Sequence, residues 1–374
     1  MPTFSPDRPV ASASTISILG AGHCGCAMAA DLMARGFDVL LHAHPHHRRV
    51  LDAISKGGGL QATGLVTGRF LPRLTTCLVE TLEFSTTVVV ALPASAHDGL
   101  IAALAGHDLR SHCLIGINGN FFVLGAARVV SAGLVVETST SPFAARVRGN
   151  VVNLRGRKAM MWAGGQRMPD VQEKALVQRV FSMPLEWMSS ALAVDLSCVT
   201  GVMHPAPMLM NAGRIESTVE GFLFYREGMT RAVGKVMHAV DDERCAIAAA
   251  LGLALPSALG IMNRYYGLSH DSLSGFAAHS TVHNVEKSAP TSLEHRYLSQ
   301  DIPYVLAPWA ALGQRLGVPT PTIDALMRLA SLATGGPTAG RGRTLESIGL
   351  DRLTARELGR LALGEAACSM QLSD

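Results

Sequence analysis

Short apolar runs alternate with amphipathic segments along the first half of the chain. Five runs are apolar enough to form buried strands, and segments with helical spacing follow most of them. The runs are Ile16–Leu19, Phe37–Leu41, Thr86–Leu92, His112–Ile117 and Leu134–Glu137. Because strands that alternate with helices favour a mostly parallel sheet with right-handed crossovers, we expect an α/β fold with a doubly wound sheet.

The pattern changes towards the middle of the chain. Short β-like runs at Val151–Leu154 and Lys158–Trp162 predict antiparallel additions to the same sheet. Beyond about Met188 strands largely disappear, and helical spacing dominates. The clearest helical stretches are Met229–Leu253, Ser257–Tyr265, Ile302–Leu316 and Thr322–Leu332. We therefore expect two domains, an α/β domain over residues 1–188 and an all-helical domain over residues 189–374.

A glycine-rich loop follows the first apolar run. Gly20 allows a tight turn, Gly22 lets the backbone approach a pyrophosphate, and Gly25 lets the following helix pack closely on the strand. The N-terminus of that helix favours phosphate charge, so the loop predicts a dinucleotide site; a plain strand–turn–helix connection is the alternative. The residues expected to contact the cofactor here are Gly20, Ala21, Gly22, His23, Cys24 and Gly25.

The end of the second predicted strand bears on the choice of cofactor. An acid there accepts from a ribose 2′-hydroxyl, but Asp38 comes too early in the strand. His44 and Arg48 instead offer donors and positive charge, which favours NADP, with NAD as the alternative. The same basic stretch could also be a histidine-rich metal tract or the solvated start of the next helix. Leu92–Ala94 turns the chain after another buried strand, and we expect Leu92, Pro93 and Ala94 at the ligand-binding edge.

Composition narrows the functional class. The 374 residues are 48% hydrophobic and 16% charged, which is typical of a folded chain, and the net charge of +3 gives no reason to expect nucleic acid. No charge-free apolar run reaches about twenty residues, so no membrane span is expected. Met1–Ser14 lacks the apolar core of a signal peptide and predicts a loose tail. Seven cysteines without a Cys-x-x-Cys pair favour a reducing compartment, so we expect a cytoplasmic protein.

The helical half contains a second group of residues suited to chemistry. His204 precedes Pro205 at a predicted helix start, where its ring can project freely. Asp301 precedes another proline-started helix, and Arg296 lies about one turn before it. Each has a structural alternative: a hydrogen-bonded core histidine, a helix N-cap and a surface ion pair, respectively. His279 and His283 share a helix face but lack a third ligand, so no metal site is expected.

With these residues in view, the chain resembles the octopine/nopaline (opine) dehydrogenase family over nearly its whole length. The resemblance implies an N-terminal Rossmann domain and a helical C-terminal domain. The matching segments are Gly20–Gly25, Leu92–Ala94, Glu137–Arg146, Met203–Pro205, Asn211–Glu216, His295–Pro303 and Gly317–Asp324.

The resemblance implies reductive condensation. The amino group of an amino acid and an α-keto acid form an imine, which NAD(P)H reduces. In the family a histidine–aspartate pair moves the proton; His204 would be the acid and base, and Asp301 would orient it and stabilise its charge. We further interpret Arg296 as a carboxylate clamp and Asn211 as a second substrate-binding residue.

The chain also departs from the family pattern. Gln300 stands where an acid often precedes the aspartate, and Thr200 or Cys198 occupies the region where an asparagine often sits a turn before the histidine. Both departures concern the substrates rather than the proton-transfer pair.

Two other functions remain open from the sequence. One is an NADPH-dependent reductase that converts a 2-keto acid to a hydroxy acid, although such enzymes typically need a lysine, and neither Lys235 nor Lys287 lies in a clear motif. The other is a non-catalytic nucleotide-binding sensor, which would not need His204 and Asp301. In each case we expect small-molecule partners, and the apolar helical half permits a homodimer.

Overall fold

The computed structural model describes residues 14–218, 220–285, 289–336 and 342–365. The predicted N-terminal tail, up to residue 13, and Lys287 lie outside these ranges. The chain divides into two compact units, and each is described by itself. The first unit comprises Met1–Ala91 and Ala145–Leu154, and the second comprises Leu92–Ala144 and Arg155–Asp374. This division does not test the domain boundary expected at residue 188, which stays a prediction.

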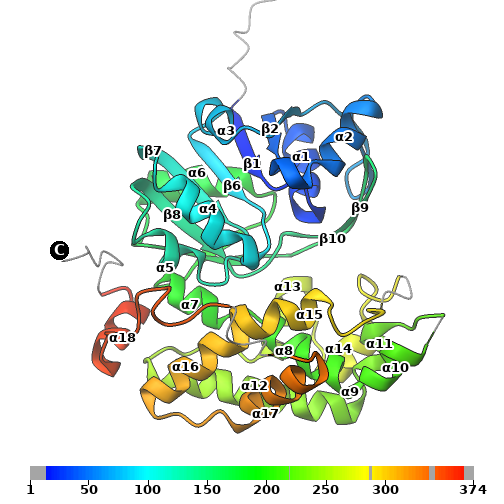
Figure 1. Cartoon of the computed structure of the whole chain (residues 1–374), viewed down its shortest axis with the longest axis vertical. Coiled ribbons are helices and arrows are strands. Elements are labelled where there is room, and N and C mark those ends of the chain that lie inside the picture. Colours follow the sequence, from blue (N-terminus) through cyan, green and yellow to red (C-terminus); the bar gives the residue numbers. More distant parts are fainter. Residues whose placement is uncertain (1–13, 219, 286–288, 337–341, 366–374) are drawn as a thin grey trace, which may run out of the picture. The chain divides into compact units, whose positions relative to one another are not determined.

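The first unit is organised around four parallel strands in the order β6-β1-β2-β5. Every residue of β1 after Thr15 is buried, as the continuous apolar run predicts for a strand covered on both faces. Figure 1 shows the helices of this unit packed beside these strands. The elements are β1 (Thr15–Leu19), α1 (His23–Ala34), β2 (Asp38–His42), η1 (Pro45–His47), α2 (Arg49–Lys56), β5 (Arg73–Thr75), α3 (Leu78–Phe84) and β6 (Thr87–Val90).

A second sheet corrects one sequence prediction. The run Val151–Leu154 was expected to extend the main sheet, but it belongs to β10, which pairs in parallel with β3 in a separate four-stranded sheet. The strand order is β4-β3-β10-β9. These strands are β3 (Leu60–Gly64), β4 (Gly68–Phe70), β9 (Phe143–Arg148) and β10 (Val151–Arg157).

The second unit begins with four more strands in the order β7-β8-β11-β12. β7 and β8 are parallel, whereas β11 runs antiparallel to β8, as expected for the run near Trp162. Asp170 caps α6 with a capping box that also uses Glu173. The elements are η2 (Ala94–Ala96), α4 (His97–Leu104), β7 (Leu109–Gly116), α5 (Phe122–Ala126), β8 (Ala132–Thr138), β11 (Met161–Gly165), α6 (Val171–Val180) and β12 (Leu185–Trp187).

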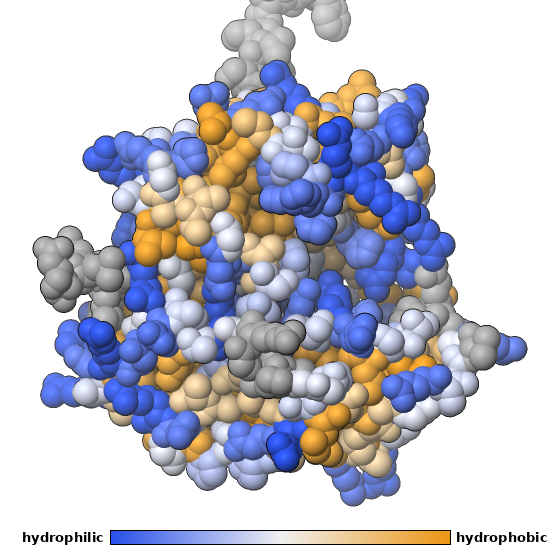
Figure 2. Space-filling model, viewed as in Figure 1, coloured by the Kyte–Doolittle hydropathy of each residue, from blue (hydrophilic) through white to orange (hydrophobic). Residues whose placement is uncertain are grey.

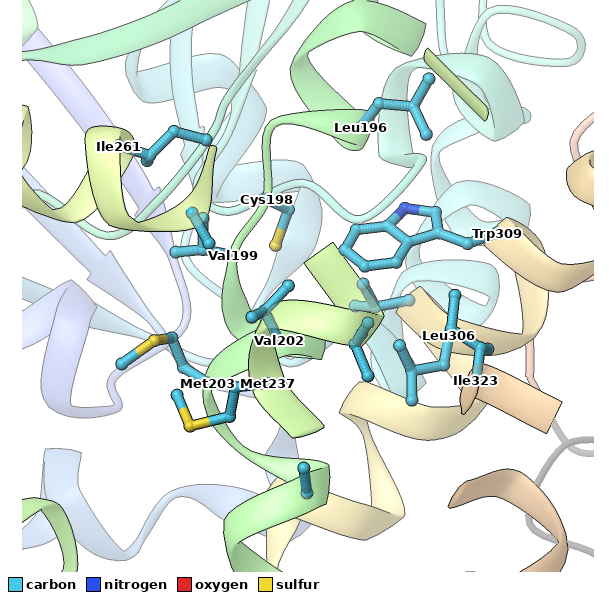
Figure 3. Packing of buried hydrophobic residues seen from close by; sticks show 14 of the residues in the cluster. Leu196, Cys198, Val199, Val202, Met203, Met237, Ile261, Leu306, Trp309 and Ile323 are labelled. Atoms are coloured by element: carbon cyan, nitrogen blue, oxygen red, sulfur yellow. The ribbon is translucent and has the colours of Figure 1, made fainter. Parts of the chain in front are cut away.

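From residue 191 onwards the described chain is helical, as expected. Helices α12, α16 and α17 pack against one another (Figure 1), and Trp309 of α16 is fully buried. Figure 3 shows this indole among Leu196, Val202, Leu306 and Ile323. The elements are α7 (Ala191–Leu196), α8 (Thr200–Met203), α9 (Pro205–Met210), α10 (Ala212–Ser217), α11 (Phe224–Gly228), α12 (Arg231–Ala250), α13 (Ala258–Tyr266), α14 (Leu273–His279), α15 (Arg296–Ser299), the π-helix η3 (Ile302–Leu306), α16 (Ala307–Leu316), α17 (Pro321–Ala333) and α18 (Ala355–Ala362).

Apolar side chains are largely withdrawn from the surface. On the face visible in Figure 2, hydrophobic residues form separated patches among hydrophilic ones. By length and composition alone, Ala191–Met210 could cross a membrane, but 89% of its apolar window is buried inside the structure. A core helix passes the same test, and here the segment forms part of the helical core.

Candidate active site

The glycine loop has the geometry that a pyrophosphate needs. Gly20 has a positive φ of 118°, and a Cβ on Gly25 would lie 1.7 Å from the carbonyl oxygen of Gly20, so only glycine fits this packing of α1 on β1. A Cβ on Gly22 would meet nothing within 4 Å, so the backbone is open there. Gly22 caps α1 without a side-chain hydrogen bond, and the first turn holds no acid. The N-terminal N–H groups of α1 therefore suit an anionic group.

His23 links this loop to a strand of the second sheet. Its Nδ1 accepts a hydrogen bond of 2.9 Å from the backbone N–H of Val147 in β9. The loop residue after it, Cys24, is half-buried, whereas Ala21 is buried. The side chain of His23 thus ties the glycine loop to β9 within the first unit, which a glycine at this position could not do.

The basic stretch after β2 is a short 3₁₀ turn and a helix start. His44 caps η1 by accepting from the backbone N–H of His46, and Arg48 pairs with Asp52 one helical turn on, at 3.0 Å. Both basic side chains are exposed. The basic stretch is therefore the solvated start of a helix, one of the alternatives considered above. Because His44 and Arg48 are exposed, they could still bind a phosphate. Asp38 pairs with Arg73 at 3.3 Å, away from the end of the strand.

The residues after β6 form the expected turn. Pro93 is the N-cap of η2, Ala94 is buried, and the carbonyl oxygen of Leu92 lies 3.3 Å from Nε2 of His97. Since burial lowers the pKa of His97 to about 3, the ring is neutral and donates this hydrogen bond. The turn is therefore held from within the second unit.

The two residues expected to move a proton lie together. Nδ1 of His204 is 2.6 Å from Oδ2 of Asp301, although 97 positions separate them in the chain. Their exposed fractions are only 8% and 6%. Asp301 is the N-cap residue of η3 but makes no side-chain capping bond, so its carboxylate is committed to the histidine instead.

The local sequence explains how these two segments meet. Pro205 has no N–H to continue α8, so the helix breaks at His204 and α9 begins. A Cβ on Gly201 would lie within 3.0 Å of Val305, Leu306 and Trp309, so glycine lets α8 approach η3 and α16 closely. The close packing of α8 on η3 brings the end of one helix to the start of the other.

A tyrosine fixes the plane of the histidine ring. Tyr297 stacks on His204 with ring centroids 3.7 Å apart and an interplanar angle of 15°. With Nδ1 bound to Asp301, Nε2 has no hydrogen-bond partner among the described residues. The ring is held by a carboxylate on one side and a stacked ring on its face, with Nε2 left for a reacting group. The sequence placed Tyr297 in a matching segment but did not predict this contact.

The two expected substrate-binding residues differ in their surroundings. Arg296 is exposed and forms no ion pair with any described residue, so the surface ion pair considered as its alternative is not found. Asn211 donates both hydrogens of its amide group, to the carbonyl oxygens of Pro207 and Gly228. These bonds tie α9 to α11, and the substrate role of Asn211 stays a prediction.

Amide groups reach the region before His204 from a distant turn. The thiol of Cys198 lies 3.7 Å from Oδ1 of Asn118, 3.6 Å from Oδ1 of Asn120 and 3.2 Å from Oγ1 of Thr200. Where the resemblance leads one to expect an asparagine on the helix, the second unit thus brings two asparagines from the turn after β7. Nothing in the sequence indicated the contact of Asn118 with Cys198, which joins residues 80 positions apart.

Groups of three or more metal-ligating side chains are absent from the described residues. His283, one of the pair at helical spacing, lies within hydrogen-bond distance of Tyr266 and Ser280.

The comparisons with known proteins fit this geometry. The sequence model described as NAD/NADP octopine/nopaline dehydrogenase, alpha-helical domain, matches residues 187–334. The opine dehydrogenase of Arthrobacter sp. (strain 1C) is 30% identical over 361 residues, which span 91% of this chain and 96% of that protein. The chain belongs to the octopine/nopaline (opine) dehydrogenase family.

Another relative agrees with this membership, and a solved structure agrees with the fold. The protein ocs of Agrobacterium tumefaciens (strain Ach5) is 26% identical and spans 93% of this chain and 99% of that one. A structure of octopine dehydrogenase with NADH and agmatine has a TM-score of 0.73 at 18% identity, covering 94% of this chain and 98% of that chain. The predicted family and the Rossmann-plus-helical fold class are confirmed. The protein is an NAD(P)-dependent oxidoreductase of the opine dehydrogenase type, acting on CH–NH bonds.

Proposed function

We propose that this member of the family joins an amino acid to an α-keto acid, with His204 as the acid and base and NADPH as the preferred reductant. The observation that carries the proposal is the buried 2.6 Å contact between His204 and Asp301. A bound nicotinamide supplies the hydride, and the glycine loop with its open Gly22 is suited to the pyrophosphate of such a cofactor.

The proton steps follow from the orientation of the ring. Nδ1–H donates to Asp301, so Nε2 is the atom that accepts or gives a proton. Nε2 first takes a proton from the substrate ammonium, freeing the amine to attack the keto carbon. It then protonates the hydroxyl that leaves as water, and the imine forms. The carboxylate of Asp301 stabilises the imidazolium between these steps.

Carboxylate recognition is assigned to Arg296. Its guanidinium has no ion pair among the described residues, and it neighbours Tyr297, which stacks on the catalytic ring. A guanidinium binds a carboxylate through two parallel hydrogen bonds, and both substrates carry a carboxylate beside the reacting atom. Asn211 is a second candidate through Oδ1, because both hydrogens of its amide group are committed to backbone carbonyls.

The preference for NADPH rests on the end of β2. His44, Arg48 and Arg49 are exposed there, and an acid that could hold a ribose 2′-hydroxyl is missing between His42 and Arg49. A 2′-phosphate would meet positive charge and imidazole donors instead. The pairing of Arg48 with Asp52 is exposed and therefore weak enough for a phosphate to compete with it.

The remaining expectations are part of the same proposal. We place the protein in the cytoplasm, because its scattered cysteines suit a reducing compartment. A homodimer is compatible with the exposed Leu329 and Leu332 on α17, one helical turn apart. The domain division at residue 188 is supported by the helical-domain model of the family, which begins at residue 187.

The test combines cofactor binding with turnover. Purified protein is titrated with NADPH and NADH by fluorescence, and oxidation is then followed with keto acids such as pyruvate and 2-oxoglutarate, each with and without a panel of amino acids. We expect tighter binding of NADPH, and oxidation that needs both substrates. His204→Asn should lower kcat/KM by about 10²–10⁴-fold, the usual range for a lost acid–base group.

His238→Asn is the matched control, because that histidine lies on α12 without a hydrogen bond to any described residue. Oxidation with a keto acid alone would favour a hydroxy-acid reductase. Tight binding of NADPH without turnover on any pair would favour a nucleotide sensor, and full activity of the His204 variant would remove the proton-transfer role.

A further inference from the structure

Two buried carboxyl groups meet in the second unit, away from the residues assigned above. Glu137 lies in β8 and is fully buried, and Asp195 lies in α7 with an exposed fraction of 3%. Each uses one oxygen to accept from the segment after β7, Asp195 from the end of the turn and Glu137 from the first turn of α5. The backbone N–H of Phe121 donates to Oδ1 of Asp195 at 2.6 Å, and that of Val123 donates to Oε2 of Glu137 at 3.3 Å.

The second oxygen of each carboxyl group has no hydrogen-bond donor among the described residues. Oε1 of Glu137 and Oδ2 of Asp195 are buried and meet no N–H or O–H donor among the described residues. The two carboxyl groups also interact with each other, and two buried carboxylates without donors would repel, so a proton on one of them is favoured. A single shared proton satisfies both oxygens and leaves the pair with one negative charge rather than two.

The charged surroundings match one negative charge. Arg343 is 2% exposed and forms an ion pair with the exposed Asp98 of α4. Its positive charge lowers the pKa of both carboxyl groups and so favours a negative charge on the pair. The other titratable groups facing this cluster are His97 on α4, Cys198 after α7 and Tyr304 on η3. Burial raises the pKa of Glu137 to about 7, and burial together with the charge of Glu137 raises that of Asp195 well above its usual value.

The turn that the pair holds is a strained one. Asn118, Asn120 and Phe121 all have positive φ, at 52°, 50° and 66°, although none is glycine. A Cβ on Gly119 would lie 1.8 Å from Oε2 of Glu137, so the turn closes directly on this carboxyl. Such a backbone persists only where surrounding contacts over-determine it. The two carboxyl acceptors are among those contacts, beside Thr138, which accepts from the backbone N–H groups of Asn118 and Gly119, and Arg343, which donates to the carbonyl oxygen of Asn120.

From this turn a chain of contacts leads to the catalytic histidine. The amides of Asn118 and Asn120 lie against the thiol of Cys198, whose sulfur is 3.2 Å from Oγ1 of Thr200. The carbonyl oxygen of Thr200 then accepts from the backbone N–H of His204 at 3.1 Å. Burial raises the pKa of Cys198 to about 12, so the thiol keeps its proton and can act as a donor.

We propose that Glu137 and Asp195 are positioning residues that share one proton, hold the turn at residues 118–121, and thereby set His204 through Cys198 and Thr200. The proposal rests on the proposed catalytic role of His204. Neither carboxyl touches a reacting atom; the pair acts by giving α8 a fixed neighbour at its first turn.

The test replaces each carboxyl with its amide. In Glu137→Gln or Asp195→Asn, the new NH₂ group donates where the shared proton did, and the pair keeps one negative charge. In the double variant both remaining positions carry NH₂ groups that face each other, so one must turn and leave Phe121 or Val123 without its acceptor. The readouts are kcat, KM for each substrate and the affinity for NADPH, with unfolding followed in parallel.

We expect each single variant to keep kcat within about threefold of wild type, as rescue by an isosteric donor predicts. The double variant should lose about 100-fold in kcat, the effect of misplacing a catalytic group by about 1 Å, with NADPH affinity changed less than twofold. Single variants as damaged as the double would overturn the shared proton. A double variant as active as wild type would overturn the positioning role.

Unfolding keeps the test independent of turnover. If the double variant does not fold, the pH dependence of melting in the other proteins decides on the shared proton. Between pH 5 and pH 8 the melting temperature of wild type should fall further than that of either single variant, because only wild type loses the shared proton. An equal fall in all three proteins would refute the shared proton. If wild type oxidises NADPH with none of the substrate pairs, the proposed function fails, and the same melting curves still decide on the shared proton.

Discussion

A buried arginine offers the sharpest test of how the helical part is held together. Arg244 on α12 is fully buried, and its Nε donates to Oδ1 of Asp241 at 2.8 Å. Its two NH₂ groups donate to the carbonyl oxygens of Leu196 and Pro256, at 2.7 and 2.8 Å. The second oxygen of Asp241 accepts from the backbone N–H of Ala258, the first residue of α13. One ion pair thus joins the end of α7, the centre of α12 and the start of α13.

Replacing Arg244 with methionine keeps much of the side-chain length but removes every donor. Asp241 would then be a buried carboxylate with a single backbone partner, and two buried carbonyl oxygens would lose theirs. Removing one member of a buried ion pair costs about 3–5 kcal/mol, and the two orphaned carbonyls place the result in the upper part of that range. We therefore expect Arg244→Met to lower the free energy of unfolding by about 4–5 kcal/mol.

The assay is urea unfolding followed by circular dichroism, with the midpoint and slope compared between variants. Arg264→Met is the control, since Arg264 pairs with Glu186 while both side chains are nearly half exposed, and its loss should cost about 0–1 kcal/mol. Adding Asp241→Leu to the Arg244 variant should recover part of the loss, because no unpaired charge then remains. A loss below about 1 kcal/mol in Arg244→Met would refute the reasoning.

Two further outcomes follow from single positions. Gly25→Ala puts a Cβ against the carbonyl oxygen of Gly20 and should weaken NADPH binding at least about tenfold in a fluorescence titration. Gly99→Ala, at an open helical position, is the control and should leave the affinity for NADPH unchanged. Equal affinities of the two variants would contradict the glycine-loop assignment. Burial raises the pKa of Glu137 from 4.5 to about 7, so its protonated carboxyl contributes stability below pH 4.5 that is lost as the pH rises through 7. In pH-dependent urea unfolding, the free energy of unfolding of wild type should therefore fall by about 3 kcal/mol relative to Glu137→Gln over this window. Parallel curves for the two proteins would refute this prediction.

Local patterns in the sequence predicted the parts of the fold that local physics determines. The strand over Ile16–Leu19 and the helix after the glycine loop were predicted from an apolar run and a glycine turn, and the structure has them as β1 and α1. Gly25 shows why: a side chain there would collide with the carbonyl oxygen of Gly20. The second sheet was missed because the pairing of β10 with β3 joins segments about ninety residues apart, which no local pattern encodes.

The candidate site divides in the same way. His204 and Asp301 were named through the family resemblance, since nothing in the spacing of two residues 97 positions apart predicts a contact. The stacking of Tyr297 and the pairing of Glu137 with Asp195 were not predicted at all. A buried carboxyl gives no pattern of its own in a sequence, because its partner is chosen by the tertiary packing.

Asp301 shows how the two levels combine. From the sequence, an aspartate before Ile302 and Pro303 is as good a helix cap as a catalytic partner, and both readings use the same side chain. The proline weakens the first reading, because it removes one of the N–H groups that a cap would satisfy. The helix that follows is a π-helix, a form often found at functional sites, and the aspartate makes no capping bond to it. With its capping role gone and its exposed fraction at 6%, the carboxylate would be a costly unpaired charge without a partner, and His204 at 2.6 Å is that partner. The conformation of the helix start therefore favours the pairing with His204 over the capping role.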